Sequence, residues 1–468
     1  MTNNFHHRIY KALAASVIVM VAIIIAWNSA AYAQSRGGSI IRDTEIENII
    51  NEWSAPILKA SGVGSNGVNV VLVQNNALNA FVAGGANIFL YTGLIQRTDS
   101  PEELLGVFAH ELGHITGGHL IAGRAALERA SYESILGTII GVGAAILTGN
   151  GNAAAAGSAI GSSSGTNSFL SHSRVQESSA DQAALSFFDK AGLNPHGLGS
   201  FLEKLESEEL LPASQQSEYV RTHPLTANRI DALKRRSGQS PHANSAAPAE
   251  WSAQHARMKA KLVGFINPGR VQWDYDANDT AVPARYAHAI AAYRQNRESD
   301  AMRYIDGLIA QEPNNPYFHE LRGQMLVDFG RIDAALPSYK RAIEIMPQAP
   351  LIRIALAHAL IEAKSNKTAN LNAAIKHLDR AIQKERRSSR AYRLLATAHG
   401  RLGREDVAKL YLAEEAVLTR RYGYARQQAV LAKNTLPKTS KEYLRANDIL
   451  AYLETIPQQA ILESAKRR

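Results

Sequence analysis

The chain has 468 residues, more than one hydrophobic core usually supports, so two or three domains are expected. Apolar residues make up 46% of the sequence, which excludes a globally disordered protein. Cysteine is absent, which excludes disulfides and a lipid attached through a cysteine. The formal net charge of +9 gathers in basic clusters of the C-terminal half, such as 384–393 and 420–426. These clusters predict either a solvated helical face or a surface for an acidic partner or anionic lipid.

The N-terminus has the pattern of an export signal. Basic residues between positions 6 and 11 precede an apolar run from Ala12 to Trp27, and Ala31-Tyr32-Ala33 fits an A-x-A cleavage site. This order predicts a signal peptide over residues 1–33, and the alternative is that the segment remains as a membrane anchor. In both cases the rest of the chain is exported, so we expect a periplasmic protein with no nucleic-acid partner.

The region that follows the signal predicts helices around a small sheet. Apolar spacing indicates a helix over Thr44 to Lys59 and a strand over Val68 to Val73. From Asn79 to Tyr91, two apolar runs flank Gly84-Gly85, which predicts a hairpin or kinked pair of strands. Helical spacing resumes at Pro101, where a proline and two glutamates fit the first turn. This second helix carries the main motif of the sequence.

The motif is His110-Glu111-Leu112-Gly113-His114, which fits H-E-x-x-H. Residues four apart on a helix share one face, so both imidazoles can bind one ion. A zinc ion lowers the pKa of its water to about 7, and Glu111 can take the proton while that water attacks a peptide carbonyl. Because so short a pattern also occurs by chance, the prediction needs a third metal ligand as support.

A second motif offers that ligand. Glu177 and Asp181 lie four apart at the start of a predicted helix, so Glu177 can complete the site while Asp181 hydrogen-bonds a ligand histidine. The alternative is a solvated helix start, where acidic residues are common. His119 is not expected to bind the metal, since on a continuing helix it would point about 140° away from His114. We expect it to play a structural or supporting role.

Between the two motifs lies an apolar segment with many glycines. The run Ile135 to Leu147 leads into a stretch rich in alanine, glycine and serine from Gly149 to Gly165. It is too short and too rich in glycine to be assigned as a membrane span. The pattern fits a lid or membrane-touching loop near the active site, and it fits a packed helix with a loop equally well.

The C-terminal half contains an internal repeat. Residues 239–280, which begin with a run rich in serine, alanine and proline, are expected to form a linker. Beyond them, small residues recur with a period of 34 residues and one five-residue insertion near 364–370. They occupy two equivalent positions, Ala289, Gly323, Ala357 and Ala396 at the first, and Ala301, Ala335, Ala374 and Ala408 at the second. This period predicts tetratricopeptide repeats over 281–430, a helical cap over 431–468 and a concave surface that binds partners.

Taken together, the motifs resemble the M48 peptidases, including exported members with a C-terminal tetratricopeptide domain. The resemblance rests on the H-E-x-x-H helix, the E-x-x-x-D motif, the segment around Gly84-Gly85, and Thr222-His223-Pro224-Leu225 followed by Arg229. It covers nearly the whole mature chain. It implies an α+β fold, with a thermolysin-like zincin domain containing a small antiparallel sheet over 34–238 and an all-α repeat solenoid after it.

The resemblance also implies a set of site residues. The metal ligands would be His110, His114 and Glu177, around one zinc ion per chain. Glu111 would be the catalytic base, and Asp181 would support the site. In the family the histidine of the His-Pro motif can approach and block the metal, which would make His223 a regulatory or auxiliary ligand. The sequence itself shows only a histidine in an extended segment. It leaves the roles of Arg174 and Arg229 open between orienting the site or substrate and a surface position.

The implied function is protein quality control in the bacterial envelope. The strands around Phe81 to Tyr91 would hold an extended substrate through backbone hydrogen bonds, which suits unfolded or misassembled envelope proteins. The repeat domain would bind the machinery of outer-membrane protein assembly, and peripheral membrane contact is a further expectation. The alternative is a repeat-based chaperone or scaffold with a latent metal site.

Overall fold

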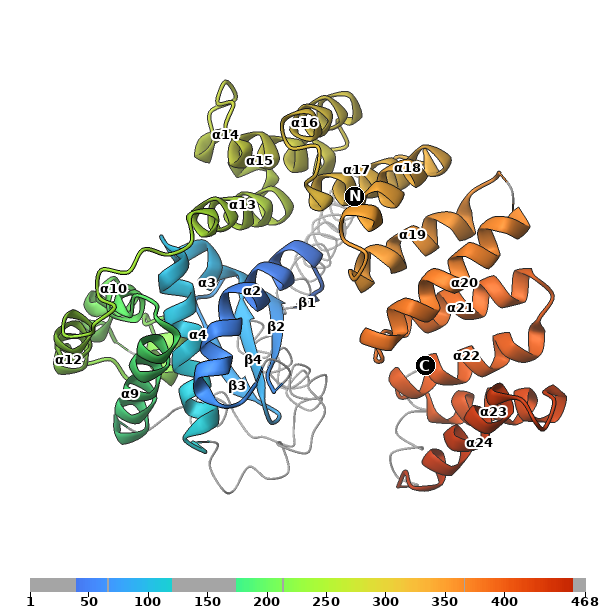
Figure 1. Cartoon of the computed structure of the whole chain (residues 1–468), viewed down its shortest axis with the longest axis horizontal. Coiled ribbons are helices and arrows are strands. Elements are labelled where there is room, and N and C mark those ends of the chain that lie inside the picture. Colours follow the sequence, from blue (N-terminus) through green and yellow to red (C-terminus); the bar gives the residue numbers. More distant parts are fainter. Residues whose placement is uncertain (1–38, 65–66, 120–173, 213, 366, 458–468) are drawn as a thin grey trace, which may run out of the picture. The chain divides into compact units, whose positions relative to one another are not determined.

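The computed structural model describes residues 39–64, 67–119, 174–212, 214–365 and 367–457 (Figure 1). The predicted signal peptide and the apolar segment 135–165 lie outside the described residues. Within the described ranges, no helix combines the length and the apolar character needed to cross a membrane. The chain divides into two compact units. The first contains the residues up to Arg42 and Ile46–Lys259, and the second contains Asp43–Glu45 and the residues from Ala260 onwards.

The first unit contains a four-stranded sheet in the order β1-β2-β4-β3. The strands are β1 (Ser39–Ile41), β2 (Asn69–Gln74), β3 (Ala80–Ala83) and β4 (Asn87–Tyr91). As predicted, β3 and β4 form an antiparallel hairpin, and Gly84 and Gly85 at its turn have φ values of 61° and 87°. Every residue of β4 is buried, as expected for a central strand.

The prediction that the sheet is antiparallel is wrong, because the sheet is mixed. After β2 the chain passes to the outer edge and forms β3, and the hairpin then returns as β4 between β3 and β2. Strands β2 and β4 therefore run parallel, with Leu72 opposite Leu90. The strand segments were visible in the sequence, but their order depends on pairing between distant residues. The arrangement leaves β3 at the sheet edge, packed against α4.

Helix α4 (Pro101–Thr116) is the central helix of the first unit (Figure 1). Ser100 caps it by accepting a hydrogen bond from the backbone N–H of Glu103, and every residue from Leu104 to His114 is buried. Helices α9 (Arg174–Ala191) and α10 (His196–Glu203) pack against it. The remaining helices of this part are α2 (Thr44–Ser61), α3 (Thr92–Arg97), η2 (Glu206–Leu210), α11 (Glu218–Thr222) and α12 (Ala227–Gly238).

The range 239–280, predicted as a linker, contains α13 (Ala249–Ile266), η3 (Pro268–Arg270) and α14 (Val271–Asp274). Helix α13 is packed rather than open. The indole of Trp251 stacks on Trp53 with ring centroids 5.4 Å apart, and the Nε2 atom of His255 lies 2.9 Å from the hydroxyl of Thr98. The linker-like composition ends before α13, where apolar residues return at helical spacing, so composition alone placed the boundary too far along the chain.

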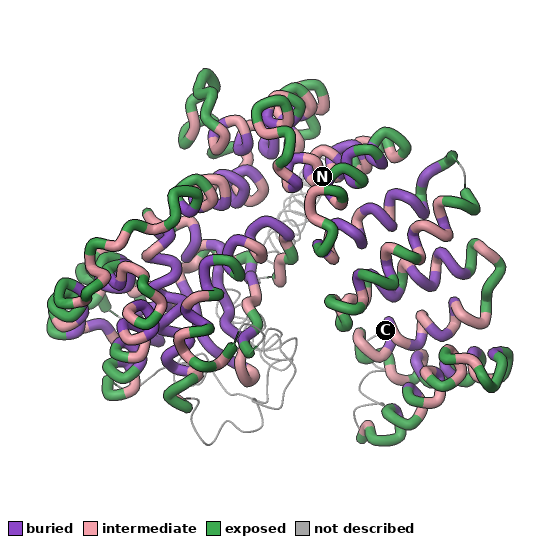
Figure 2. Tube along the Cα trace, in the orientation of Figure 1, coloured by how far each residue is buried: buried purple, intermediate pink, exposed green. Residues whose placement is uncertain are grey.

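The second unit contains a run of helices whose buried faces meet those of their neighbours (Figure 2). The helices are α15 (Val282–Arg294), α16 (Glu298–Gln311), α17 (Pro316–Asp328), α18 (Ile332–Ile345), α19 (Pro350–Glu362), α20 (Lys367–Lys384), α21 (Ser389–Arg401), α22 (Glu405–Leu418), α23 (Tyr422–Thr435) and α24 (Lys441–Glu454). All eight small residues of the predicted repeat are buried. Gly330 and Gly403, with φ values of 77° and 76°, form turns between paired helices.

The second unit also contains a cluster of charged residues from three distant parts of the sequence. The ammonium of Lys261 lies 2.7 Å from a carboxylate oxygen of Asp43 and 3.3 Å from one of Glu45. The hydroxyl of Tyr286 donates a 2.9 Å hydrogen bond to Glu45. Thr44, between the two acids, donates a 2.7 Å hydrogen bond to Glu320. The cluster therefore gathers three carboxylates around one lysine.

Candidate metal centre

Helix α4 brings the two histidines of H-E-x-x-H together. His110 and His114 are fully buried, and their Nε2 atoms lie 3.1 Å apart. Their rings meet edge to face, with centroids 4.7 Å apart. The spacing of four residues places both rings on one side of the helix, as the sequence predicts.

Helix α9 supplies the carboxylate. The two oxygens of Glu177 lie 3.3 Å from the Nε2 atom of His114 and 3.4 Å from that of His110. This approach depends on Gly113, because a Cβ atom at that position would lie 2.7 Å from the carbonyl oxygen of Ala180. A glycine in the motif therefore allows α9 to pack against α4 closely enough for Glu177 to reach the histidines.

His223 also enters the centre. Its Nδ1 atom lies 3.1 Å from Glu177 and 3.4 Å from the Nε2 atom of His110, and its Nε2 atom lies 3.4 Å from Glu111. The ring stacks on Tyr219, which precedes it by one turn of α11, with centroids 4.6 Å apart. Tyr219 was not predicted as a site residue, since nothing in the sequence motif distinguishes it from an ordinary core tyrosine.

These residues form a donor set that fits a metal ion. One ligand atom each from His110, His114, Glu177 and His223 lie within 4.8 Å of one another, and all four residues are buried. Three imidazoles and one carboxylate are ligands that zinc prefers. Lone pairs that converge in a buried space repel one another unless a cation lies between them, so the chemistry of the four donors fits a zinc ion.

A supporting layer surrounds the four donors. A carboxylate oxygen of Asp181 lies 2.9 Å from the Nδ1 atom of His110, the nitrogen that faces away from the other donors. Arg229 contacts both Asp181 and Glu177 at 2.7 Å. The sequence left the role of Arg229 open, and the structure places this side chain in the centre.

His119 belongs to this supporting layer. Its Nδ1 atom lies 3.1 Å from the Nδ1 atom of His114. Helix α4 ends at Thr116, and Gly118 with a φ of 63° turns the chain back toward the helix. His119 therefore does not lie on a continuing helix, and the expectation that it points away from His114 is wrong. Its position nevertheless agrees with the expected supporting role, because it contacts a candidate ligand and stands outside the group of four.

Burial and charge shift the pKa values of the acidic groups in opposite directions. Burial raises the pKa of Glu111, although the imidazoles of His223 and His110 oppose this. Burial also acts to raise the pKa of Glu177, but the same two imidazoles overcome it and hold that pKa well below its usual value. For Asp181, the guanidinium of Arg229 and the imidazole of His110 likewise outweigh burial and lower the pKa.

The pKa of His110, the imidazole beside these carboxylates, shifts upward. Burial acts to lower the pKa of His110, but Glu177 and Asp181 outweigh it and raise the pKa to about 9. The Glu177 and Asp181 carboxylates are therefore held ionised, as metal ligation and support require, while Glu111 is the carboxylate with the stronger tendency to bind a proton.

Known proteins match both parts of the chain. Residues 41–237 match the model of peptidase family M48, and residues 286–350 match a tetratricopeptide-repeat model. The chain therefore contains a peptidase M48 domain followed by tetratricopeptide repeats. This confirms the resemblance and the α+β fold class. M48 peptidases use zinc, in agreement with the donor set of the centre.

Individual relatives support the same assignment. The chain is 26% identical over 404 residues to the beta-barrel assembly-enhancing protease of Escherichia coli K12, covering 84% of this chain and 80% of that protein. It is 26% identical to the protein of the same name from Yersinia pestis, with coverage of 74% and 71%. Metalloprotease YcaL of Escherichia coli K12 is 29% identical over 199 residues, covering 39% of this chain and 68% of that protein.

Proposed function

We propose that this M48 metallopeptidase is a zinc-dependent endopeptidase of the bacterial periplasm that degrades misfolded or misassembled envelope proteins. The ligands would be His110, His114 and Glu177, with Glu111 as the catalytic base and Asp181 in support. The main support for the proposal is that the side chains of these ligands lie close together in the protein interior, with Glu111 beside them. A bound zinc ion supplies a Lewis acid and lowers the pKa of water to about 7.

Glu111 is suited to proton transfer. Its side chain is fully buried, and neither oxygen has a hydrogen-bond partner among the described residues. Burial raises the pKa of Glu111, which brings it closer to the neutral range where a general base is most effective. Glu111 would take a proton from the attacking water at a carboxylate oxygen and deliver it to the amide nitrogen of the leaving group.

Asp181 would orient His110. Its carboxylate lies beside the Nδ1 atom of His110, so that atom carries the proton and the Nε2 lone pair faces the metal position. The carboxylate remains ionised because Arg229 and His110 lower its pKa.

His223 closes the centre in the described arrangement. It contacts Glu177 and Glu111, and its Nε2 atom lies 3.4 Å from the backbone carbonyl of Ala80. Ala80 begins β3, the edge strand along which an extended substrate would pair. We propose that His223 must leave this position before a peptide can reach both the metal and the edge strand, so the protease would be latent until it opens.

The relatives and the repeats support the proposed cellular role. Pairing with an edge strand uses backbone groups, so it suits unfolded chains of many sequences. The relatives named beta-barrel assembly-enhancing protease support a link to outer-membrane protein assembly. The repeats would bind partners in that assembly machinery, and the N-terminal signal pattern supports export to the periplasm.

A second candidate is a chaperone or scaffold that acts through its repeats and keeps the metal site latent. The position of His223 over Glu177 and Glu111 favours this alternative, because it covers both the metal and the base.

Replacing the proposed base Glu111 distinguishes the protease from the chaperone or scaffold. The Glu111→Gln variant should lose casein cleavage by about 10²- to 10⁴-fold while it retains zinc, since the amide cannot accept the proton. Glu102→Gln, in the first turn of the same helix, is the matched control and should cleave like the wild type. If Glu111→Gln restores envelope assembly in a deletion strain as fully as the wild type does, proteolysis is not the main activity.

A further inference from the structure

We propose that Arg229 is a positioning residue of the metal centre, whose guanidinium fixes both supporting carboxylates and keeps one oxygen of Glu177 directed at the metal. The proposal rests on the ligand assignment above, and it extends that assignment to a cation that would set how tightly the metal is held. Arg229 lies on α12, 48 residues beyond Asp181, so the motif spacing does not reveal the connection.

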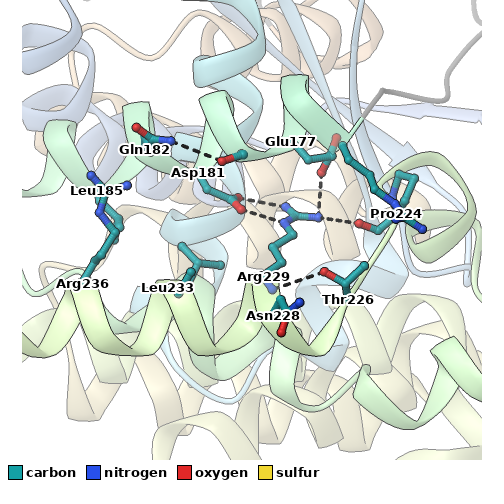
Figure 3. A pocket seen from close by; sticks show the side chains of 13 residues that line it. Glu177, Asp181, Gln182, Leu185, Pro224, Thr226, Asn228, Arg229, Leu233 and Arg236 are labelled. Atoms are coloured by element: carbon teal, nitrogen blue, oxygen red, sulfur yellow. Dashed lines mark hydrogen bonds and ion pairs between the residues drawn. The ribbon is translucent and has the colours of Figure 1, made fainter.

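The guanidinium contacts three oxygen-bearing groups (Figure 3), and its Nη2 atom also lies 3.5 Å from the Nε2 atom of His110. Its Nε and Nη2 atoms donate to the two oxygens of Asp181 at 2.7 Å and 2.9 Å, which is a bidentate pair. Its Nη1 atom lies 2.7 Å from the Oε2 atom of Glu177 and donates to the backbone carbonyl of Pro224 at 3.3 Å. Arg229 thereby joins the metal ligand, the partner of His110 and the residue next to His223.

This pattern requires arginine. The side chain of Arg229 is only 7% exposed, and a buried cation is stable only when its donors are paired. A planar fork can bind Asp181 with two donors and Glu177 with another at the same time. Lysine would supply the charge, but a single ammonium cannot reproduce the fixed geometry.

The charges of the centre also require a cation. Glu177 and Asp181 contribute two negative charges in a buried space, and Arg229 is the cation that contacts both carboxylates. The Oε2 atom of Glu177 faces Arg229, while the Oε1 atom lies 3.3 Å from His114, so Oε1 would be the oxygen left for the metal.

Arg229 also lines a groove of the first unit. A groove of about 250 Å³ runs between α9 and α12, and Arg229 lines it together with Glu177 and Asp181 (Figure 3). Arg229 therefore holds the two carboxylates in place at the edge of this groove. A shorter side chain would admit water there and free Glu177 to turn away from the histidines.

Zinc affinity tests the role of Arg229. We expect Arg229→Gln to weaken zinc binding about 10- to 100-fold in a chelator competition, the range usual for residues that support metal ligands. The rise in Tm on adding zinc should shrink accordingly. Arg229→Lys should fall between Arg229→Gln and the wild type. Arg236→Gln is the matched control, because Arg236 lines the same groove on α12 but is exposed, and it should leave zinc affinity unchanged.

A double-mutant cycle sharpens the test. The Asp181→Asn, Arg229→Gln double variant should bind zinc no more weakly than the worse single variant, because the two residues act as one unit. The proposal is overturned if Arg229→Gln and Arg229→Lys both lower the Tm of the metal-free protein but bind zinc within twofold of the wild type. If the wild type itself binds no zinc, the ligand assignment fails rather than the role of Arg229.

Discussion

The metal centre and the repeat helices differ in the kind of side chain that they bury. In the metal centre the buried side chains are histidines and carboxylates, and each is held by a partner that comes from another helix. In the repeats the buried positions are mostly small apolar residues at equivalent sites. Charged groups in a core specify one geometry and tolerate little change, whereas packed repeats distribute stability over many similar contacts. The two regions share one requirement, which is glycine where helices approach most closely.

The largest effect is expected at Gly113. An alanine there would place its Cβ atom 2.7 Å from the Ala180 backbone and push α9 away from α4. We expect Gly113→Ala to lower the free energy of unfolding by about 1–3 kcal/mol and to weaken zinc binding strongly, because Glu177 moves with α9. Urea unfolding and zinc titration would measure both effects.

Gly199→Ala is the control for this change. Gly199 lies on α10, and the nearest atoms to a Cβ there are 3.8 Å away, an ordinary contact. Unchanged zinc affinity in Gly113→Ala would show that the close approach of α9 does not set the ligand geometry.

In the repeats, a substitution at Gly323 also tests how closely two helices approach each other at a glycine, in this case away from the metal centre. A Cβ atom at Gly323 would lie 2.9 Å from the buried ring of Tyr339. Gly323→Ala should therefore destabilise the protein by about 1–2 kcal/mol. Gly307→Ala, on α16 with nothing within 4 Å, should instead stabilise it by up to about 1 kcal/mol, since alanine favours helices. Chemical unfolding of the two variants should give opposite signs, and equal signs would contradict the packing argument.

The charged cluster of the second unit is an exception to the apolar repeats. Burial raises the pKa of Glu320 from 4.5 to about 7, although Lys261 acts against it. The folded state therefore holds this proton more tightly than the unfolded state, so the contribution of Glu320 is complete below about pH 4.5. Stability is lost as the pH rises from about 4.5 through 7.

Glu320→Gln removes this pH dependence. The variant should match the wild type near pH 4.5 and exceed it by about 3 kcal/mol near pH 8, because glutamine carries no charge. Chemical unfolding at the two pH values measures the difference. Glu454→Gln, at an exposed position of α24, should show no such trend. A Glu320→Gln variant that loses stability as the pH rises would contradict the assignment.

The sequence predicted those features that depend on local spacing. The helices that carry His110, His114 and Glu177 follow from helical periodicity, and the period of 34 residues predicted the buried small residues of the repeats. The roles of the individual site residues remain predictions that the geometry supports.

Features that depend on distant residues could not be predicted in the same way. The parallel pairing of β2 with β4, the contacts of Arg229 and the cluster around Lys261 all join segments far apart in the chain. Helix α13 was missed for a different reason, since a run of serine, alanine and proline before it suggested an open linker across the whole range.

The zinc content of the purified protein shows whether the histidines and Glu177 hold a metal ion. We predict one zinc ion per chain in the wild type and almost none in Glu177→Ala, measured after dialysis against a weak chelator. A wild type without zinc, or a Glu177→Ala variant that keeps its zinc, would contradict the account.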